Sequence, residues 1–103
     1  MDEETVYAVG NPSYAKHIQR ILKYPVVPSL SENAELREHG VSRVGAGYST
    51  WGITLHPTLV DSTERTIAIP MYELQKKDVR SESELIEFCK SAILEALNKP
   101  QNV

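Results

Sequence analysis

The sequence predicts an α+β fold, a two-layer sandwich in which a βα unit is followed by an antiparallel meander and a C-terminal helix packed on the sheet. Apolar side chains recur at helical spacing after Pro12 and again after Ser81. Apolar and polar residues alternate in the segments between these two helices. The chain has 103 residues, of which 41% are hydrophobic, so we expect a single domain over residues 1–103 with its own core.

The chain is expected to begin with a short strand, Thr5–Val9, that turns sharply at Gly10 into a helix. Asn11 is a favourable N-cap, and Pro12 suits the first helical position because its missing N–H costs nothing there. The helix should run to about Tyr24, where Pro25 stops it. Its predicted apolar face consists of Tyr14, Ala15, Ile18, Ile21 and Leu22.

Two less regular segments follow this helix. Residues 25–28 (Pro-Val-Val-Pro) are expected to be extended, as an edge strand or a loop, because two prolines leave few donors for a β-ladder. Ser31 then has the character of an N-cap for a short helix, and Gly40 that of its end.

The middle of the chain is predicted to be β structure. Val41–Val44 is a brief predicted strand that Gly45-Ala46-Gly47 should break. Tyr48–Leu55 is the clearest strand, with Trp51 on its buried face, and His56-Pro57 should end or bend it. A turn at residues 61–64 and a strand at residues 65–71 complete the expected meander.

The C-terminal helix has the strongest local signals. Ser81 and Glu84 have the spacing of a capping box, and Pro100 lies just beyond the expected end. Leu94 falls between Glu87 and Lys90 around the helix and is expected to be exposed. The apolar stripe that should face the sheet contains Leu85, Ile86, Cys89, Ala92, Ile93, Ala96 and Leu97.

The outer face of the first helix is a candidate partner-binding surface. Lys16, Arg20 and Lys23 lie along this face, with His17 at its side. No aspartate or glutamate occurs between Thr5 and Ser31, although the whole chain has a net charge of −3. Most solvated helix faces mix their signs, so this patch points to an acidic partner surface or to nucleic-acid phosphates.

A small-molecule site is the alternative hypothesis. The turn at Gly10, Asn11 and Ser13 could hold a nucleotide or another anion at a helix N-terminus. The glycine-rich segment that follows the brief strand could let a ligand approach the backbone; its candidate residues are Gly45, Gly47, Tyr48, Ser49 and Thr50. A simple helix cap and a bent strand explain these two patterns better, and the turn at Gly10 lacks the glycine-rich length of a phosphate-binding loop.

Nothing in the sequence favours an enzyme, a metal or another cofactor. His17, His39 and His56 share no metal-ligand spacing, and a single cysteine, Cys89, allows no intrachain disulfide. The acidic N-terminus lacks the pattern of a signal peptide, and no apolar run is long enough to cross a membrane, so a cytoplasmic protein is expected. We therefore expect a small protein-interaction module of inhibitor, immunity or adaptor type, with a nucleotide sensor and a nucleic-acid-binding module as alternatives.

Overall fold

The basic N-terminal segment forms helix α2 (Pro12–Ile21), the first element in the computed structural model, which describes residues 12–98. The apolar face expected from the sequence is the buried one: Ala15, Ile18 and Ile21 are each no more than 5% exposed. The expected strand Thr5–Val9, together with Gly10 and the Asn11 cap, lies outside the described residues.

The first helix ends just before Pro25, as the sequence predicted. In the turn η1 (Leu22–Val26), Tyr24 leaves the helical region with φ −160° and ψ 123°, and the Tyr24–Pro25 bond is cis. The chain then resumes as α3 (Val27–Ser31), so the expectation of an extended Pro-Val-Val-Pro segment is wrong. Burial explains the difference, because Val26 and Leu30 are fully buried and a helix places both on the core side.

Helix α4 (Ala34–Glu38) is the expected short helix, but Asn33 caps it instead of Ser31. The Asn33 side chain accepts a hydrogen bond from the Leu36 amide at 3.0 Å. Gly40, with φ +88°, ends this segment as expected, since that conformation favours glycine. Ser31 has a different role: its hydroxyl accepts from the Val44 amide at 3.0 Å and donates to the Val44 carbonyl at 3.2 Å.

Replacing Ser31 with alanine should destabilise the fold by about 1–3 kcal/mol, because both backbone groups of the buried Val44 lose their partner. Urea unfolding of the wild type and Ser31→Ala measures the difference. Ser29→Ala, which removes a nearby hydroxyl with no such bridge to Val44, is the matched control. A Ser31→Ala midpoint equal to that of the control would show that the bridge contributes nothing.

Strands β1 (Val41–Tyr48) and β2 (Gly52–Leu59) form an antiparallel hairpin that is longer than expected. The glycines at 45 and 47 do not break β1, because they pair with His56 and Thr54 across the hairpin. Strand β2 likewise continues through Pro57, which is buried and pairs with Val44 of β1. The Val44 N–H points away from β2 and bonds to Ser31, so Val44 and Pro57 are at a position where the two strands exchange no hydrogen bond. Pro57 therefore removes no hydrogen bond between the two strands, and the expectation that it ends the strand is wrong.

The turn of this hairpin occupies the place where the sequence predicted a strand. Ser49 donates its amide N–H to the Gly52 carbonyl at 2.9 Å, and its hydroxyl accepts from the Trp51 amide at 3.1 Å. Trp51 therefore lies in the turn, 62% exposed, and its expected place in the core is wrong. Tryptophan has high strand propensity, but these polar contacts of the turn decide the local conformation here.

Strand β3 (Ile67–Pro70) pairs with β2 and completes a sheet of order β1-β2-β3. The expected turn before it is present: the Asp61 carboxylate accepts from both the amide and the hydroxyl of Thr63. The strand ends earlier than expected, because Met71 begins a helix, α5 (Met71–Lys76), that the sequence did not predict. Met71 and Leu74 lie three residues apart and are both buried, which a helix achieves on one face.

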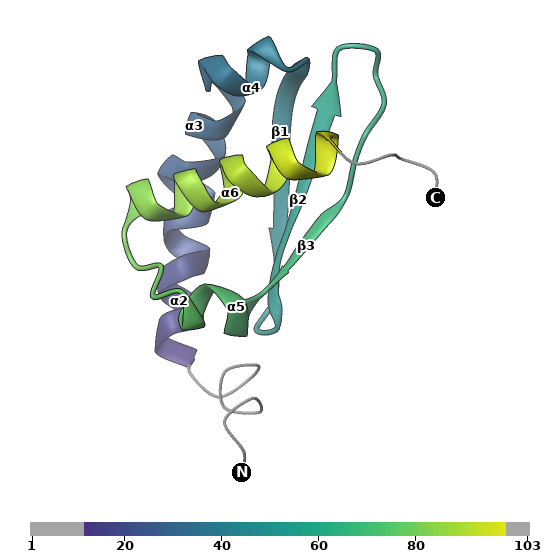
Figure 1. Cartoon of the computed structure of the whole chain (residues 1–103). Coiled ribbons are helices and arrows are strands. Elements are labelled where there is room, and N and C mark those ends of the chain that lie inside the picture. The colour runs from purple at the N-terminus through teal and green to yellow at the C-terminus, as the bar shows by residue number, and fades with distance from the viewer. Residues whose placement is uncertain (1–11, 99–103) are drawn as a thin grey trace.

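Helix α6 (Glu82–Leu97) crosses the front of the molecule, over both the N-terminal helices α2 and α3 and the sheet (Figure 1). The predicted capping box at Ser81 and Glu84 is present. The helix packs against η1, α3, β2 and β3, and it buries Leu85, Cys89 and Ile93. Leu94 is half-buried against the core, so its expected exposure is wrong.

The helices cover one face of the sheet, and the hydrophobic core lies between the helices and this face. This confirms an α+β domain with an N-terminal helix, a three-stranded antiparallel meander and a C-terminal helix that packs on the sheet and on the first helix. The fully buried side chains at its centre include Ile18, Leu22, Leu30, Leu36, Ile53, Leu55, Leu74, Leu85 and Ile93.

Candidate functional site

The basic residues of α2 form a stripe on the side of the helix that faces away from the core. Lys16, Arg20 and Lys23 are all exposed, whereas the buried residues of α2 and η1 lie on the other side. Since the stripe makes no contribution to the core, its charges are available to solvent or to a partner.

The β1–β2 turn lies against one side of this stripe. The side-chain amide of Gln19 donates to the Ser49 carbonyl at 3.4 Å. Gln19 is next to Arg20 in sequence and one helical turn from Lys16 and Lys23. The hydrogen bond joins residues thirty positions apart, so no local pattern in the sequence indicates it. It brings together the two regions that the sequence marked as separate candidates, the basic helix and the segment around Ser49 and Thr50.

Two large aromatic side chains accompany this turn. Trp51 is 62% exposed and Tyr48 is 50% exposed. Tyr48 pairs with the buried Ile53, and directly opposed residues of an antiparallel pair point to the same face, so Tyr48 lies on the face that the helices cover. Tyr48 thus points to the same side of the sheet as α2.

His17 connects the other side of the stripe to the loop before α6. Its Nε2 contacts the Arg80 carbonyl, and its Nδ1 lies 3.0 Å from Nη2 of Arg20. Arginine can only donate, so Nδ1 is the acceptor and Nε2 carries the hydrogen that is donated to Arg80. The imidazole therefore positions Arg20, which makes His17 a supporting residue of the stripe more than a contact residue.

Acidic residues that are distant in sequence lie near this second side. Arg80 forms an ion pair with Asp78, and Asp78 raises the pKa of the guanidinium by accepting its hydrogen bond. Glu82 lines a shallow hollow of about 490 Å³ together with His17 and Arg20. The stripe is therefore free of carboxylates along α2 but is bordered by them where α6 begins, a neighbourhood that only the fold reveals.

Tyr14 fastens the loop before α6 to α2 from beneath the stripe. Its hydroxyl donates to the Val79 carbonyl at 2.6 Å, and burial raises the pKa of the phenol to about 12. The phenol is therefore un-ionised at neutral pH, as a donor to a carbonyl must be. Tyr14 and His17 together hold residues 79 and 80 against α2, which gives the stripe a fixed border.

Those residues of the alternative ligand site that the structure describes do not come together around a cavity. Gly45 and Gly47 pair with His56 and Thr54, so they lie on the face of the sheet away from the helices. Ser13 is at the start of α2, in a hollow of about 370 Å³ lined also by Asp78 and Arg80. Ser49 and Thr50 are in the hairpin turn, while Gly10 and Asn11 lie outside the described residues.

His39 and Cys89 have structural surroundings. His39 Nδ1 contacts the Glu35 carbonyl at the end of α4, and Cys89 is fully buried in α6. Among residues 12–98, no three histidine, cysteine, aspartate or glutamate side chains are grouped closely enough to hold a metal ion. Within the same range, no helix combines the length and the apolar character that a membrane span requires.

Cys89 should not react with a thiol reagent while the protein is folded. Burial raises the pKa of its thiol from 9.0 to about 12, so almost no thiolate is present at pH 8. Because the thiol holds its proton more tightly in the folded than in the unfolded protein, the protonated thiol favours the folded state. This stabilisation is complete below pH 9 and is lost as the pH rises toward 12. Labelling with a disulfide reagent at pH 8, with and without denaturant, measures this, and rapid labelling of the native protein would contradict it.

The fold and this surface define the protein as an α+β domain with a basic helix stripe beside an aromatic hairpin turn. No family model matches the chain, and neither a curated protein nor a solved structure matches it.

Proposed function

We propose that this chain is a small protein-interaction module whose contact surface consists of Lys16, Arg20, Lys23, Tyr48 and Trp51, here called the basic–aromatic face. The observation that carries the proposal is the Gln19–Ser49 contact, which holds the aromatic turn beside the basic stripe. Tryptophan, tyrosine and arginine are the residue types that contribute most often to the energy of protein–protein binding.

The exposure of the aromatic residues supports this proposal. An exposed tryptophan in a hairpin turn contributes little to the fold, and the turn itself is formed by backbone groups and the Ser49 hydroxyl. When a partner removes such a side chain from water, binding is stabilised by about 25 cal/mol per Å² of apolar surface that is buried. The partner we propose is an acidic protein with an apolar recess for Trp51.

Single-stranded nucleic acid is the second candidate partner, because an exposed aromatic ring beside cations is also an arrangement for base stacking. The two candidates differ in salt dependence. Release of counterions from several phosphates gives a steep fall in affinity with salt, whereas a protein interface changes mainly its association rate.

Two variants of the basic–aromatic face test the proposal. Trp51→Ala should weaken binding about 30-fold or more if Trp51 is an anchor. Arg20→Glu with Lys23→Glu should slow association about tenfold at low salt and flatten the salt dependence. The matched control is Arg43→Glu with Lys76→Glu, which changes the net charge equally at two exposed sites elsewhere.

The measurement has two arms. In the first, wild type and variants are immobilised, and proteins from a cell lysate are compared by mass spectrometry, followed by association kinetics of any recovered protein across a salt series. In the second, a fluorescein-labelled oligothymidine is titrated into each variant. A protein retained by the wild type and the control but lost by both face variants supports the proposal. Equal retention by all variants contradicts it, and tight oligothymidine binding by the wild type and the control alone favours the second candidate.

A further inference from the structure

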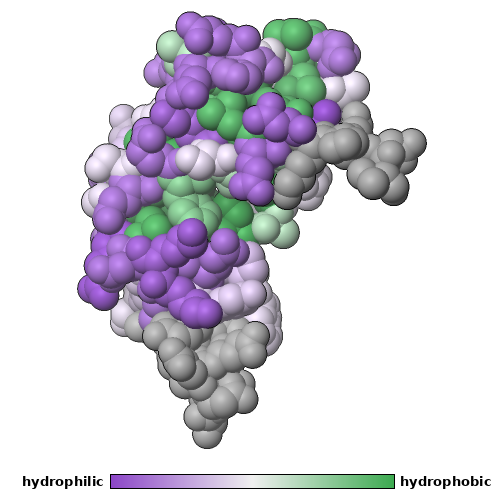
Figure 2. Space-filling view, in the orientation of Figure 1, coloured by the Kyte–Doolittle hydropathy of each residue, from purple (hydrophilic) through white to green (hydrophobic). Residues whose placement is uncertain are grey.

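A groove of about 1020 Å³ lies between helix α6 on one side and strand β3 and helix α5 on the other. Figure 2 shows an apolar strip there, bordered by hydrophilic residues above and below. Four consecutive residues, Thr66 to Ile69, line the groove. Neighbouring residues of a strand point to opposite faces, so a groove lined by all four follows the edge of the strand.

The backbone of β3 and of Thr66, the residue before it, presents unpaired groups to this groove. Arg65 donates its amide to the Pro57 carbonyl at 3.0 Å, and Met71 donates to the Trp51 carbonyl at 2.7 Å. In an antiparallel ladder, residues that bond to the neighbouring strand alternate with residues whose N–H and C=O point the other way. The N–H and C=O groups of Thr66 and Ala68 therefore point to the outer edge, where no strand of the described chain pairs with β3.

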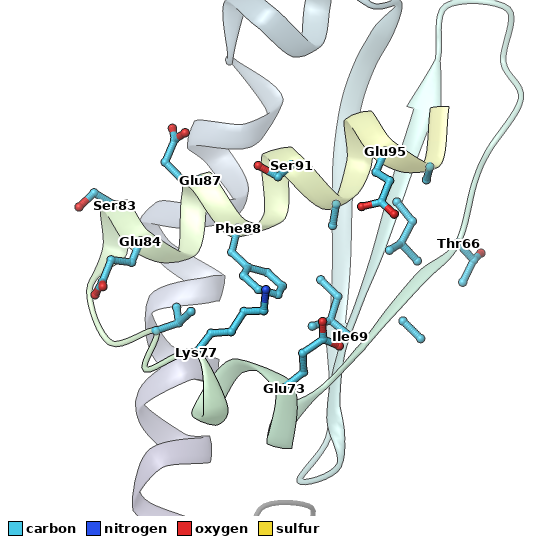
Figure 3. Close-up of a pocket in the computed structure, with 15 residues that line it drawn as sticks. Thr66, Ile69, Glu73, Lys77, Ser83, Glu84, Glu87, Phe88, Ser91 and Glu95 are labelled. Carbon is cyan, nitrogen blue, oxygen red and sulfur yellow. The ribbon is translucent and has the colours of Figure 1, made fainter. Parts of the chain in front are cut away.

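Apolar side chains form the floor and the far wall of the groove. Ile69 is buried at its base and Ile67 is half-buried. Phe88 and Ala92, which are half-buried residues of α6, face them across the groove. Figure 3 shows the Phe88 ring extending from α6 toward α5, with Lys77 beside it. An extended segment laid against β3 would place every second side chain on this apolar surface.

The rim of the groove is acidic. Its lining contains one lysine, Lys77, whose ammonium lies 5.8 Å from the centre of the Phe88 ring. In Figure 3, Glu73 of α5 and Glu95 of α6 extend into the groove from opposite sides. The glutamates that line the groove are Glu73, Glu84, Glu87 and Glu95. Such a rim attracts a positively charged occupant and repels an acidic one.

We propose that this groove binds an extended peptide segment with alternating basic and apolar side chains, which adds to β3 as a fourth strand. The free N–H and C=O groups of Thr66 and Ala68 supply the backbone pairing, and the apolar floor holds alternate side chains. The glutamates of the rim attract basic side chains through the negative potential of the groove. Two of them also have partners within the protein: Glu87 pairs with Lys90, and Glu84 accepts from the Ser81 amide. This site is separate from the basic–aromatic face, which contains none of the residues that line the groove.

The probe is a fluorescein-labelled, end-capped peptide of alternating lysine and valine, titrated into the full chain by fluorescence anisotropy at low salt. Two control peptides separate the contributions. One carries N-methyl groups on alternate backbone amides and keeps every charge, and the other has glutamate in place of each lysine. Both controls should bind about tenfold or more weakly, because one loses backbone pairing and the other meets a rim of like charge. Equal binding of all three peptides would overturn the proposal.

Protein variants test the same two contributions from the other side. Ala68→Pro removes one outward N–H at an edge position, where proline is tolerated, and should weaken binding about fivefold. Glu73→Gln with Glu95→Gln should weaken it by roughly tenfold at low salt. Thermal unfolding of each variant checks that the fold is retained. If both folded variants bind the lysine–valine peptide like the wild type, the groove is not its site.

Two further measurements distinguish the groove from the basic–aromatic face, and a partner peptide from a second copy of the chain. At physiological salt, where the Debye length is about 8 Å, Arg20→Glu with Lys23→Glu should bind the lysine–valine peptide within about twofold of the wild type, since those charges lie outside the groove. A loss of peptide binding in that variant would assign the peptide to the basic–aromatic face and overturn the groove.

Sedimentation of the full chain without peptide should show a monomer. A dimer that Ala68→Pro dissociates would show that a second copy fills the groove, and would overturn the proposal of a partner peptide.

Discussion

Replacing Ile93 with alanine should lower the free energy of unfolding by about 2–5 kcal/mol. Ile93 is fully buried in the part of α6 that crosses the sheet, and the helix packs against η1, α3, β2 and β3. Removing its side chain leaves a cavity in the core between α6 and these elements, and they cannot all move inward to fill it. Urea unfolding followed by circular dichroism measures the change.

Ser91→Ala is the matched control for Ile93→Ala. Ser91 is an exposed residue of the same helix, and alanine is a good helix former, so its midpoint should stay within about 0.5 kcal/mol of the wild type. If Ile93→Ala unfolds at the same urea concentration as Ser91→Ala, α6 does not hold the core together, and the packing of Ile93 against the sheet is wrong.

Replacing Gly52 with alanine should also destabilise the protein, by about 1–3 kcal/mol. A Cβ atom at position 52 would overlap the backbone oxygen of Ile69 and lie 3.0 Å from Cα of Pro70. Both are backbone atoms of the paired strand, so β2 and β3 would have to separate to accept it. Thermal unfolding of the variant measures the cost.

Gly47→Ala provides the comparison for Gly52→Ala. No atom lies within 4 Å of the Cβ position at Gly47, and its backbone is outside the conformations that favour glycine. Alanine there should leave stability unchanged or raise it by about 0.4–1 kcal/mol, by restricting the unfolded chain. Equal destabilisation by the two variants would show that β2 and β3 are further apart at Gly52 than the structure places them.

The sequence predicted those elements whose signals are local. The capping box at Ser81 and Glu84 and the apolar stripe around Cys89 and Ile93 identified α6, because a helix is determined by residues within one or two turns. The amphipathic pattern of α2 was predicted for the same reason. The meander was predicted as a class, but the boundaries of its strands were not.

The errors arose where contacts between distant residues decide the structure. The hairpin turn at Ser49–Trp51 has the local composition of a strand. Its position is set by the pairing between β1 and β2, and the sequence of one segment does not show which segment it pairs with. Val26 lies in a segment that two prolines make extended by local rules, although burial of Val26 and Leu30 favours a helix there. The short helix α5 lacks a cap residue that would have marked it.

The candidate site was predictable only in its parts. Lys16, Arg20 and Lys23 share a face by helical spacing alone, so the basic stripe was visible in the sequence. The neighbours of the stripe were not, since Gln19 meets Ser49 and His17 meets Arg80 only after the chain has folded. The groove beside β3 was missed for a related reason: the pairing of β3 with β2 determines which backbone groups stay free.

The two edges of the sheet differ in a way that limits self-association. On β1, the Ser31 hydroxyl occupies both the N–H and the C=O of Val44, and α3 and α4 pack along that strand. Within residues 12–98, Ser31, α3 and α4 thus partly close the edge of β1, whereas no strand pairs with the outer edge of β3. A sheet with two open edges can add copies without end and grow into a fibre, whereas a sheet with one open edge forms at most a closed pair. By capping Val44 from thirteen positions earlier in the chain, Ser31 removes one pair of backbone groups through which a second copy could extend the sheet at β1.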